Sequence, residues 1–98
     1  MNIQAMMKQA QALQKDMMKA KEEIDNTIFE GKSSFVTVQV TGDKKVKNIK
    51  IDNKQIEEDE IEMLEDMIVI AINNAMMEID KATENKMGKY TKGMPGIF

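Results

Sequence analysis

Apolar residues recur with a helical period along the first quarter of the chain. Their spacing alternates strictly between three and four residues at Ile3, Met6, Ala10, Leu13, Met17, Ala20 and Ile24. A heptad seam of this kind predicts a helix over residues 2–25 that packs against another helix. Lys8, Lys15 and Lys19 fall on the side of this helix that lies opposite the seam.

The apolar period changes to two in the middle of the chain, which predicts β-strands. The strands are expected at residues 27–31, 35–41 and 45–51. In the second of them Val36, Val38 and Val40 share one face, which is typical of a strand with one buried side. Three consecutive strands with short connections predict an antiparallel meander.

The connections between these strands carry turn signals. Residues 31–34 are expected to form the first turn, and Gly42 with Asp43 a two-residue turn of type II′. The apolar alternation of the third strand slips by one position, which predicts a β-bulge near Lys47 and Asn48.

A second helix is expected over residues 58–87, with an acidic start that complements the positive end of the helix dipole. Its main apolar stripe is Ile61, Leu64, Ile68, Ile72, Ala75, Ile79 and Ala82. Met63, Met67, Ile70 and Met77 form a second stripe beside the first. Between residues 67 and 72 the helix is apolar almost all round, and one small sheet cannot cover so much apolar surface.

These elements predict a single α+β domain over residues 1–98, with an α-β-β-β-α order and a three-stranded antiparallel sheet between two long helices. Residues 88–98 contain glycine and proline without a period, and we expect a mobile or loosely docked tail there. Helices of this length overhang strands of seven residues, so their apolar stripes need a second subunit. The residues expected in the core or the homodimer contact are Met6, Leu13, Met17, Leu64, Ile68 and Ile72.

Composition argues against catalysis. The chain has 98 residues without a histidine or a cysteine, which removes the commonest general base and the thiolate ligands of metals. Seven of the ten residues from Glu57 to Asp66 are acidic, but consecutive carboxylates spread around a helix, so a solvated helix start is favoured over a metal site. Gly88 and Lys89 lack the other residues of a phosphate-binding loop. We therefore expect no enzyme activity, no small-molecule substrate and no cofactor.

A membrane or a peptide is a weaker candidate partner than another helix. The apolar run Met67–Ile72 is far too short to span a membrane, and the N-terminal residues lack the pattern of a signal peptide, so a cytoplasmic location is expected. The 11 methionines could form an adaptable peptide-binding surface, but at helical spacing packing is the favoured interpretation.

The basic residues are all lysines, and they are unevenly distributed although the net charge is −3. Any one lysine is most simply a solvated charge, whereas two groups of them suit contacts with backbone phosphates. The first group comprises Lys8, Lys15, Lys19, Lys86, Lys89 and Lys92, which come together if the start of the first helix lies beside the end of the second. The hairpin residues Lys44, Lys45 and Lys47 form a second candidate patch.

Four segments together resemble the YbaB/EbfC family of bacterial nucleoid-associated proteins. They are MMKQAQALQKDMMKAKEEI, VTVQVTGDKKVKNIKID, EMLEDMIVIAINNA and KMGKYTKGMPGIF, which span essentially the whole chain in the family's order. The resemblance implies an intertwined homodimer with projecting helices. It also implies that these helices bind double-stranded DNA, with a role in nucleoid organisation or gene expression.

The sequence thus predicts a homodimeric DNA-binding protein of low sequence specificity, located in the cytoplasm at the nucleoid. The alternative is a dimeric scaffold that binds another protein through its methionine-rich stripes and does not bind DNA.

Overall fold

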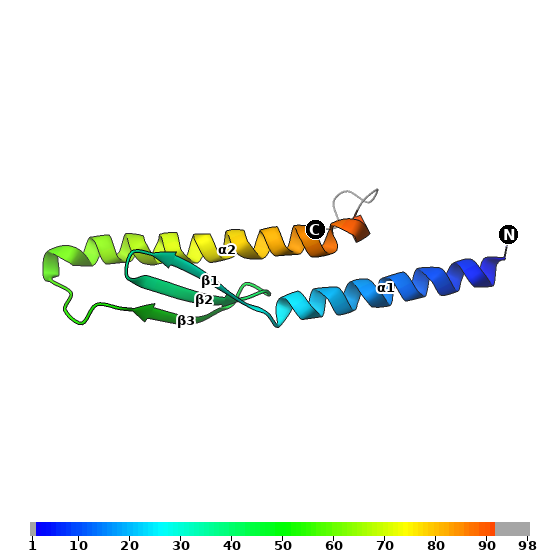
Figure 1. Cartoon of the computed structure of the whole chain (residues 1–98), viewed down its shortest axis with the longest axis horizontal. Helices are drawn as coiled ribbons and strands as arrows, with labels where there is room; N and C mark the ends of the chain where they lie inside the picture. Colours follow the sequence, from blue (N-terminus) through cyan, green and yellow to red (C-terminus); the bar gives the residue numbers. More distant parts are fainter. Residues whose placement is uncertain (1, 92–98) are drawn as a thin grey trace.

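The computed structural model describes residues 2–91 and contains two long helices and one small sheet (Figure 1). The elements are α1 (Ile3–Asp25), β1 (Ile28–Ser33), β2 (Val36–Thr41), β3 (Val46–Ile51), the short 3-10 helix η1 (Glu58–Glu60) and α2 (Ile61–Thr91). The α-β-β-β-α order and the antiparallel three-stranded sheet are confirmed.

Helix α1 begins and ends close to the predicted positions because its ends are capped. The Asn2 side chain accepts a hydrogen bond from the Gln4 amide at 3.0 Å, which satisfies one free donor of the first turn. At the other end the Thr27 hydroxyl donates to the Glu23 carbonyl at 2.6 Å, and the chain turns directly into β1.

The centre of the sheet is the valine layer predicted from the alternation in β2. Val36, Val38 and Val40 are completely buried and pack against Ala71, Ala75 and Ile79 of α2. The strand order is β1-β2-β3, so β2 is the central strand and α2 covers the valine face.

The first turn starts three residues later than predicted and is shorter, because residues 31–33 all belong to β1. A Cβ atom at Gly31 would lie 1.9 Å from the carbonyl oxygen of Ala71 and 2.5 Å from the amide nitrogen of Ala75. Glycine is therefore present because the backbone of β1 touches the backbone of α2. The chain reverses at Ser34 and Phe35, where Ser34 adopts a φ of 53°.

The second turn has three residues and is not the predicted type II′ turn. The Lys44 amide donates to the Thr41 carbonyl at 2.8 Å, and Lys44 takes the left-handed conformation with a φ of 67°. Gly42 is required for a different reason, since a Cβ there would lie 1.8 Å from the Ile24 carbonyl oxygen. The bulge is confirmed, because Gln39 pairs with Asn48 while Val40 pairs with Val46, leaving one extra residue in β3.

Helix α2 continues to Thr91, past the predicted end at residue 87. Gly88 lies inside the helix, so residues 88–91 of the predicted tail are helical, and the remainder lies outside the described residues. A helical glycine costs only about 1 kcal/mol relative to alanine, which packing of the last turns against α1 can offset.

Helix α1 projects beyond the end of the sheet and does not cover the second face of the sheet (Figure 1). Its C-terminal half packs against the end of α2 in a second small core, where Ala20, Ile24 and Met87 are buried beside Tyr90. The N-terminal part of α1, which was predicted to meet the end of α2, instead extends past it and is exposed. The offset arises because the short link to β1 fixes where α1 ends, and only the last turns of α2 overhang the sheet.

The close approach of β1 and α2 predicts that Gly31→Ala destabilises the protein by about 2–4 kcal/mol, because the added methyl group must displace backbone atoms. Thermal or urea unfolding followed by circular dichroism measures this loss. Gly88→Ala is the matched control, since nothing lies within 4 Å of a Cβ at this helical position. That substitution should stabilise the protein by about 0.5–1 kcal/mol. Equal effects of the two substitutions would contradict the packing.

Candidate nucleic-acid interface

Three of the predicted DNA-binding lysines come together where α1 and α2 meet. Lys19 of α1 and Lys86 and Lys89 of α2 line a shallow cavity of about 310 Å³. The other residues around this cavity are Asp16, Ala20, Glu23 and Tyr90. We call this group of residues the junction.

The Lys86 ammonium group donates a hydrogen bond to the Glu23 carboxylate across the junction. This hydrogen bond and the charge of Lys86 lower the pKa of Glu23 below its ordinary value of 4.5, with a smaller contribution from Lys19. The Lys86 and Glu23 side chains are 41% and 52% exposed, so solvent screens this ion pair and it contributes little to stability. Lys89 lies with its Nζ 5.0 Å from the centre of the Tyr90 ring, within the range of a cation–π contact.

The remaining lysines of the first group extend from the junction along α1. Lys8 and Lys15 are exposed on this helix, about 17 Å and 6 Å from Lys19 along its axis at 1.5 Å per residue. Lys92 lies outside the described residues. The lysines therefore lie along α1, which we call the arm, from the junction at its root toward its N-terminus.

Acidic neighbours partly neutralise the second predicted patch. Lys44 forms an ion pair with Asp80 of α2 at 3.1 Å, and Lys45 forms one with Asp43 at 3.6 Å. A hydrogen bond from the Thr41 hydroxyl is the main cause that lowers the pKa of Asp43, so this carboxylate stays charged well below neutral pH. Lys47 is the bulge residue of β3 and is exposed. The hairpin is consequently a weaker anion-binding candidate than the junction.

The largest acidic cluster lies at the opposite end of the molecule from the junction (Figure 1). Glu58, Asp59 and Glu60 form η1, and Glu60 joins Glu57 in a capping box at the start of this helical segment. Within residues 2–91 no group of three or more Asp, Glu, His or Cys residues could hold a metal ion. None of the helices described is long and apolar enough to cross a membrane.

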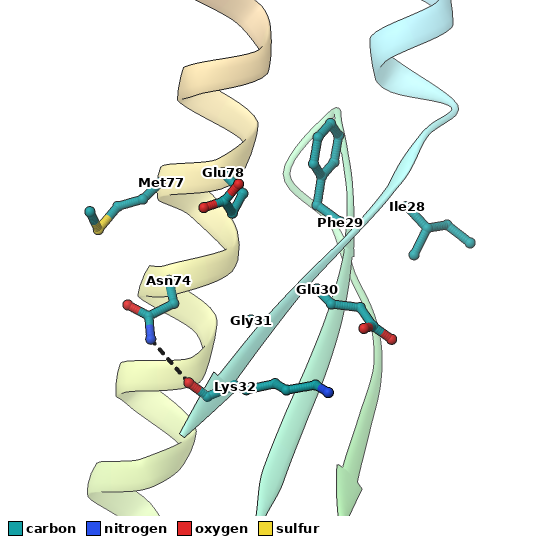
Figure 2. A pocket seen from close by; sticks show the side chains of 8 residues that line it. All are labelled: Ile28, Phe29, Glu30, Gly31, Lys32, Asn74, Met77 and Glu78. Carbon is teal, nitrogen blue, oxygen red and sulfur yellow. Dashed lines mark hydrogen bonds between the residues drawn. The ribbon is translucent and has the colours of Figure 1, made fainter. Parts of the chain in front are cut away.

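A second cavity, of about 710 Å³, lies where the outer edge of β1 passes α2 (Figure 2). Asn74 of α2 donates a hydrogen bond to the Lys32 carbonyl at 3.1 Å, which covers one exposed acceptor of this edge strand. The carboxylates of Glu30 and Glu78 lie apart and do not converge on a common point (Figure 2). This arrangement offers no catalytic pair.

The predicted core or dimer residues divide into packed and open positions. Leu64, Ile68 and Ile72 pack partly buried against the valine layer, and Met17 packs against the second core. Met6 and Leu13 belong to the same seam as Met17 but remain 51% and 53% exposed on the projecting part of α1.

Sequence reasoning missed three residues of the junction, Asp16, Glu23 and Tyr90. The spacing of Lys19 and Glu23 suggests only a contact within one helix, whereas the partner of Glu23 lies 63 positions further along the chain. Tyr90 is the only tyrosine, but nothing in the surrounding sequence indicates that it packs against α1.

Comparison with known proteins gives consistent results for sequence and fold. The YbaB/EbfC DNA-binding family matches residues 1–94. A nucleoid-associated protein of Lactococcus lactis subsp. cremoris (strain MG1363) is 50% identical over 97 residues, which cover 97% of this chain and 98% of the relative. A nucleoid-associated protein of Ligilactobacillus salivarius (strain UCC118) is 46% identical over 99 residues, covering 99% of this chain and 95% of the relative.

The fold is also found in a crystal structure of the uncharacterized protein HP0035 from Helicobacter pylori. The two structures superpose with a TM-score of 0.73 at 18% sequence identity, covering 92% of this chain and 97% of that one. At this identity the likeness shows a shared fold only. Since the sequence match extends over nearly the whole chain and includes relatives of almost equal length, the chain belongs to the YbaB/EbfC DNA-binding family.

Proposed function

We infer that this protein acts as a homodimer that binds duplex DNA mainly through backbone phosphates, with low sequence specificity. Its role would be nucleoid organisation or regulation of gene expression, in the cytoplasm at the nucleoid. The observation that carries this proposal is the convergence of Lys19, Lys86 and Lys89 at the junction, from which further lysines follow α1.

The type of cation supports phosphate contact over base readout. The chain contains no arginine, whose planar fork makes the commonest base-specific contact with guanine. Lysine supplies a point charge on a flexible stem, which suits a phosphate at any sequence. Contacts of this kind position a protein on the duplex without reading bases.

The separation of charges explains how a chain with a net charge of −3 can bind a polyanion. The acidic segment of η1 and the start of α2 lies at one end, while the junction and α1 lie at the other (Figure 1). Solvent-exposed charges separated by more than a Debye length of about 8 Å interact only weakly at physiological salt. The lysines at the junction and on the N-terminal part of α1, which carries Lys8 and Lys15 and no acidic residue before Asp16, therefore matter more than the net charge of the whole chain.

An uncovered apolar surface supports a homodimer. Val46, Ile49 and Ile51 of β3 pair directly with the three buried valines of β2, so they face the same side of the sheet as α2. Because α2 lies over β1 and β2, these three side chains are 46%, 41% and 38% exposed. A second α2 would cover them and complete the layer.

A second copy of this chain is the simplest source of that helix. A two-fold axis exchanges two identical copies, so α2 of each can cover the uncovered β3 of the other through one self-complementary surface.

The DNA-binding proposal predicts a strong dependence on salt. With about 6 phosphates contacted, affinity for a duplex should fall about 10³-fold between 50 and 200 mM salt. Reversal of two charges in Lys8→Glu/Lys15→Glu should weaken binding by about ten-fold or more in a fluorescence-anisotropy titration. The matched control is Lys50→Glu/Lys54→Glu, which makes the same change in charge on β3 and the loop beyond it. Binding that ignores salt, or equal losses in both variants, would refute the proposal.

The dimer proposal predicts a mass of about 22 kDa by sedimentation at micromolar concentration, twice the 11.2 kDa of one chain. Ile49→Asp should convert the protein to folded monomers, because it places a carboxylate in the apolar contact. Asn48→Asp adds the same charge on the neighbouring, opposite-facing residue and should leave the dimer intact. A wild-type mass near that of one chain would exclude the dimer.

The alternative of a protein-binding scaffold is supported by the exposed apolar side chains of Val69, Ile70 and Met77 on α2. The double reversal at Lys8 and Lys15 separates the two functions. It should impair DNA binding while leaving capture of a protein partner by α2 largely unchanged.

A further inference from the structure

The junction places two carboxylates, those of Asp16 and Glu23, among three ammonium groups, and of the two only Glu23 forms an ion pair with one of them. Glu23 accepts a hydrogen bond from Lys86, while Lys19 and Lys89 complete the wall of the same small cavity. A carboxylate and a phosphate diester are both anions that accept charge-assisted hydrogen bonds from an ammonium group. The position that Glu23 occupies is therefore chemically suited to a phosphate oxygen.

We propose that the junction is a binding site for a single backbone phosphate of DNA, and that Glu23 occupies this site as an internal competitor when DNA is absent. This inference rests on the proposed DNA-binding function. In the DNA-bound protein Lys86 exchanges its carboxylate partner for a phosphate, and Glu23 turns into solvent.

The geometry makes such an exchange easy. Both side chains of the pair are about half exposed, so solvent can reach them and the ion pair is weak. The Glu23 side chain is not needed for the turn that follows α1, because Thr27 hydrogen-bonds to the backbone carbonyl of residue 23. Releasing the carboxylate therefore leaves the chain path from α1 into β1 intact.

The position of the junction means that a phosphate bound there would determine where the duplex lies on the protein. The junction lies where α1 leaves the body of the protein, so a phosphate held there fixes the duplex at the root of the arm (Figure 1). Lys15 and Lys8 follow at increasing distance along the same helix and can contact successive parts of the backbone.

The exchange has a specific consequence for salt dependence. A lysine that neutralises a phosphate releases one condensed counterion. In the wild-type protein the freed Glu23 carboxylate acquires a cation when Lys86 turns to the phosphate. The net number of counterions released at the junction is therefore close to zero. Without the Glu23 carboxylate no cation is taken up, so binding should release more counterions and the dependence of affinity on salt should be steeper.

The test compares full-length Glu23→Gln with the wild type in binding to a fluorescent duplex between 50 and 200 mM salt. The variant should bind about two- to five-fold more tightly, the strength of an exposed ion pair, and its slope of log affinity against log salt should steepen by about 0.9. Glu84→Gln is the matched control, because it removes the same charge two residues from Lys86 but does not line the junction. That control should bind with the slope of the wild type.

A double-mutant cycle links the effect to Lys86. Lys86→Gln should weaken binding, and adding Glu23→Gln to it should no longer steepen the slope, since the exchanged hydrogen bond is gone. Thermal unfolding of each variant confirms that it is folded. Identical affinity and slope in Glu23→Gln and Glu84→Gln would overturn the inference while leaving the proposed function standing. Absence of wild-type binding at 50 mM salt would instead overturn both.

A titration with inorganic phosphate distinguishes a phosphate of the duplex from a free phosphate ion as the occupant of the junction. In a calorimetric titration at constant ionic strength, millimolar inorganic phosphate should not bind Glu23→Gln if the site takes only a phosphate of the duplex, which neighbouring contacts hold in place. Saturable binding of inorganic phosphate by Glu23→Gln but not by Glu23→Gln/Lys86→Gln, at concentrations that leave duplex affinity unchanged, would overturn the assignment to DNA and identify a free phosphate ion as the occupant.

Discussion

The direct contact between the backbones of β1 and α2 determines the rest of the architecture. At Gly31 the strand comes so close to Ala71 and Ala75 that a single methyl group cannot be placed between them. This contact holds α2 over β1 and β2 and buries the three central valines completely. It also leaves the third strand uncovered, and the proposed second subunit would cover that face.

The same contact explains which parts of the fold could be predicted from the sequence. The helices and the buried face of β2 depend on local periodicity, and the structure confirms them. The sequence places Gly31 at the end of a strand and at the start of a turn, because a glycine shortly before two serines is a strong local turn signal. Its true role depends on a helix 40 residues away, which no local pattern reveals. Gly42 likewise meets the end of α1, and the strained φ falls on Lys44 instead.

In the candidate interface, too, the positions of some lysines follow from local helical spacing, whereas those of others depend on contacts between distant segments. Helical spacing correctly placed Lys8, Lys15 and Lys19 on one side of α1, where all three are exposed. Which lysines of α2 would join them depended on how far α2 overhangs the sheet and at which turn it meets α1. The pairing of Lys86 with Glu23 follows from that offset and could not be predicted before the fold was known.

A carboxylate such as that of Glu23 among lysines proposed to bind DNA is at first sight a disadvantage, since it repels a polyanion. The position of Glu23 at the junction suggests a different interpretation, because Lys19, Lys86 and Lys89 lie close together and their ammonium groups repel one another in the absence of DNA. Glu23 relieves this repulsion, and the exposed pair is weak enough for a phosphate to replace it. In the proposed exchange, the pair reduces this repulsion while the protein is free and limits affinity for any single stretch of DNA. A protein that contacts many sites with low specificity benefits from such a limit, because it can leave one site for the next.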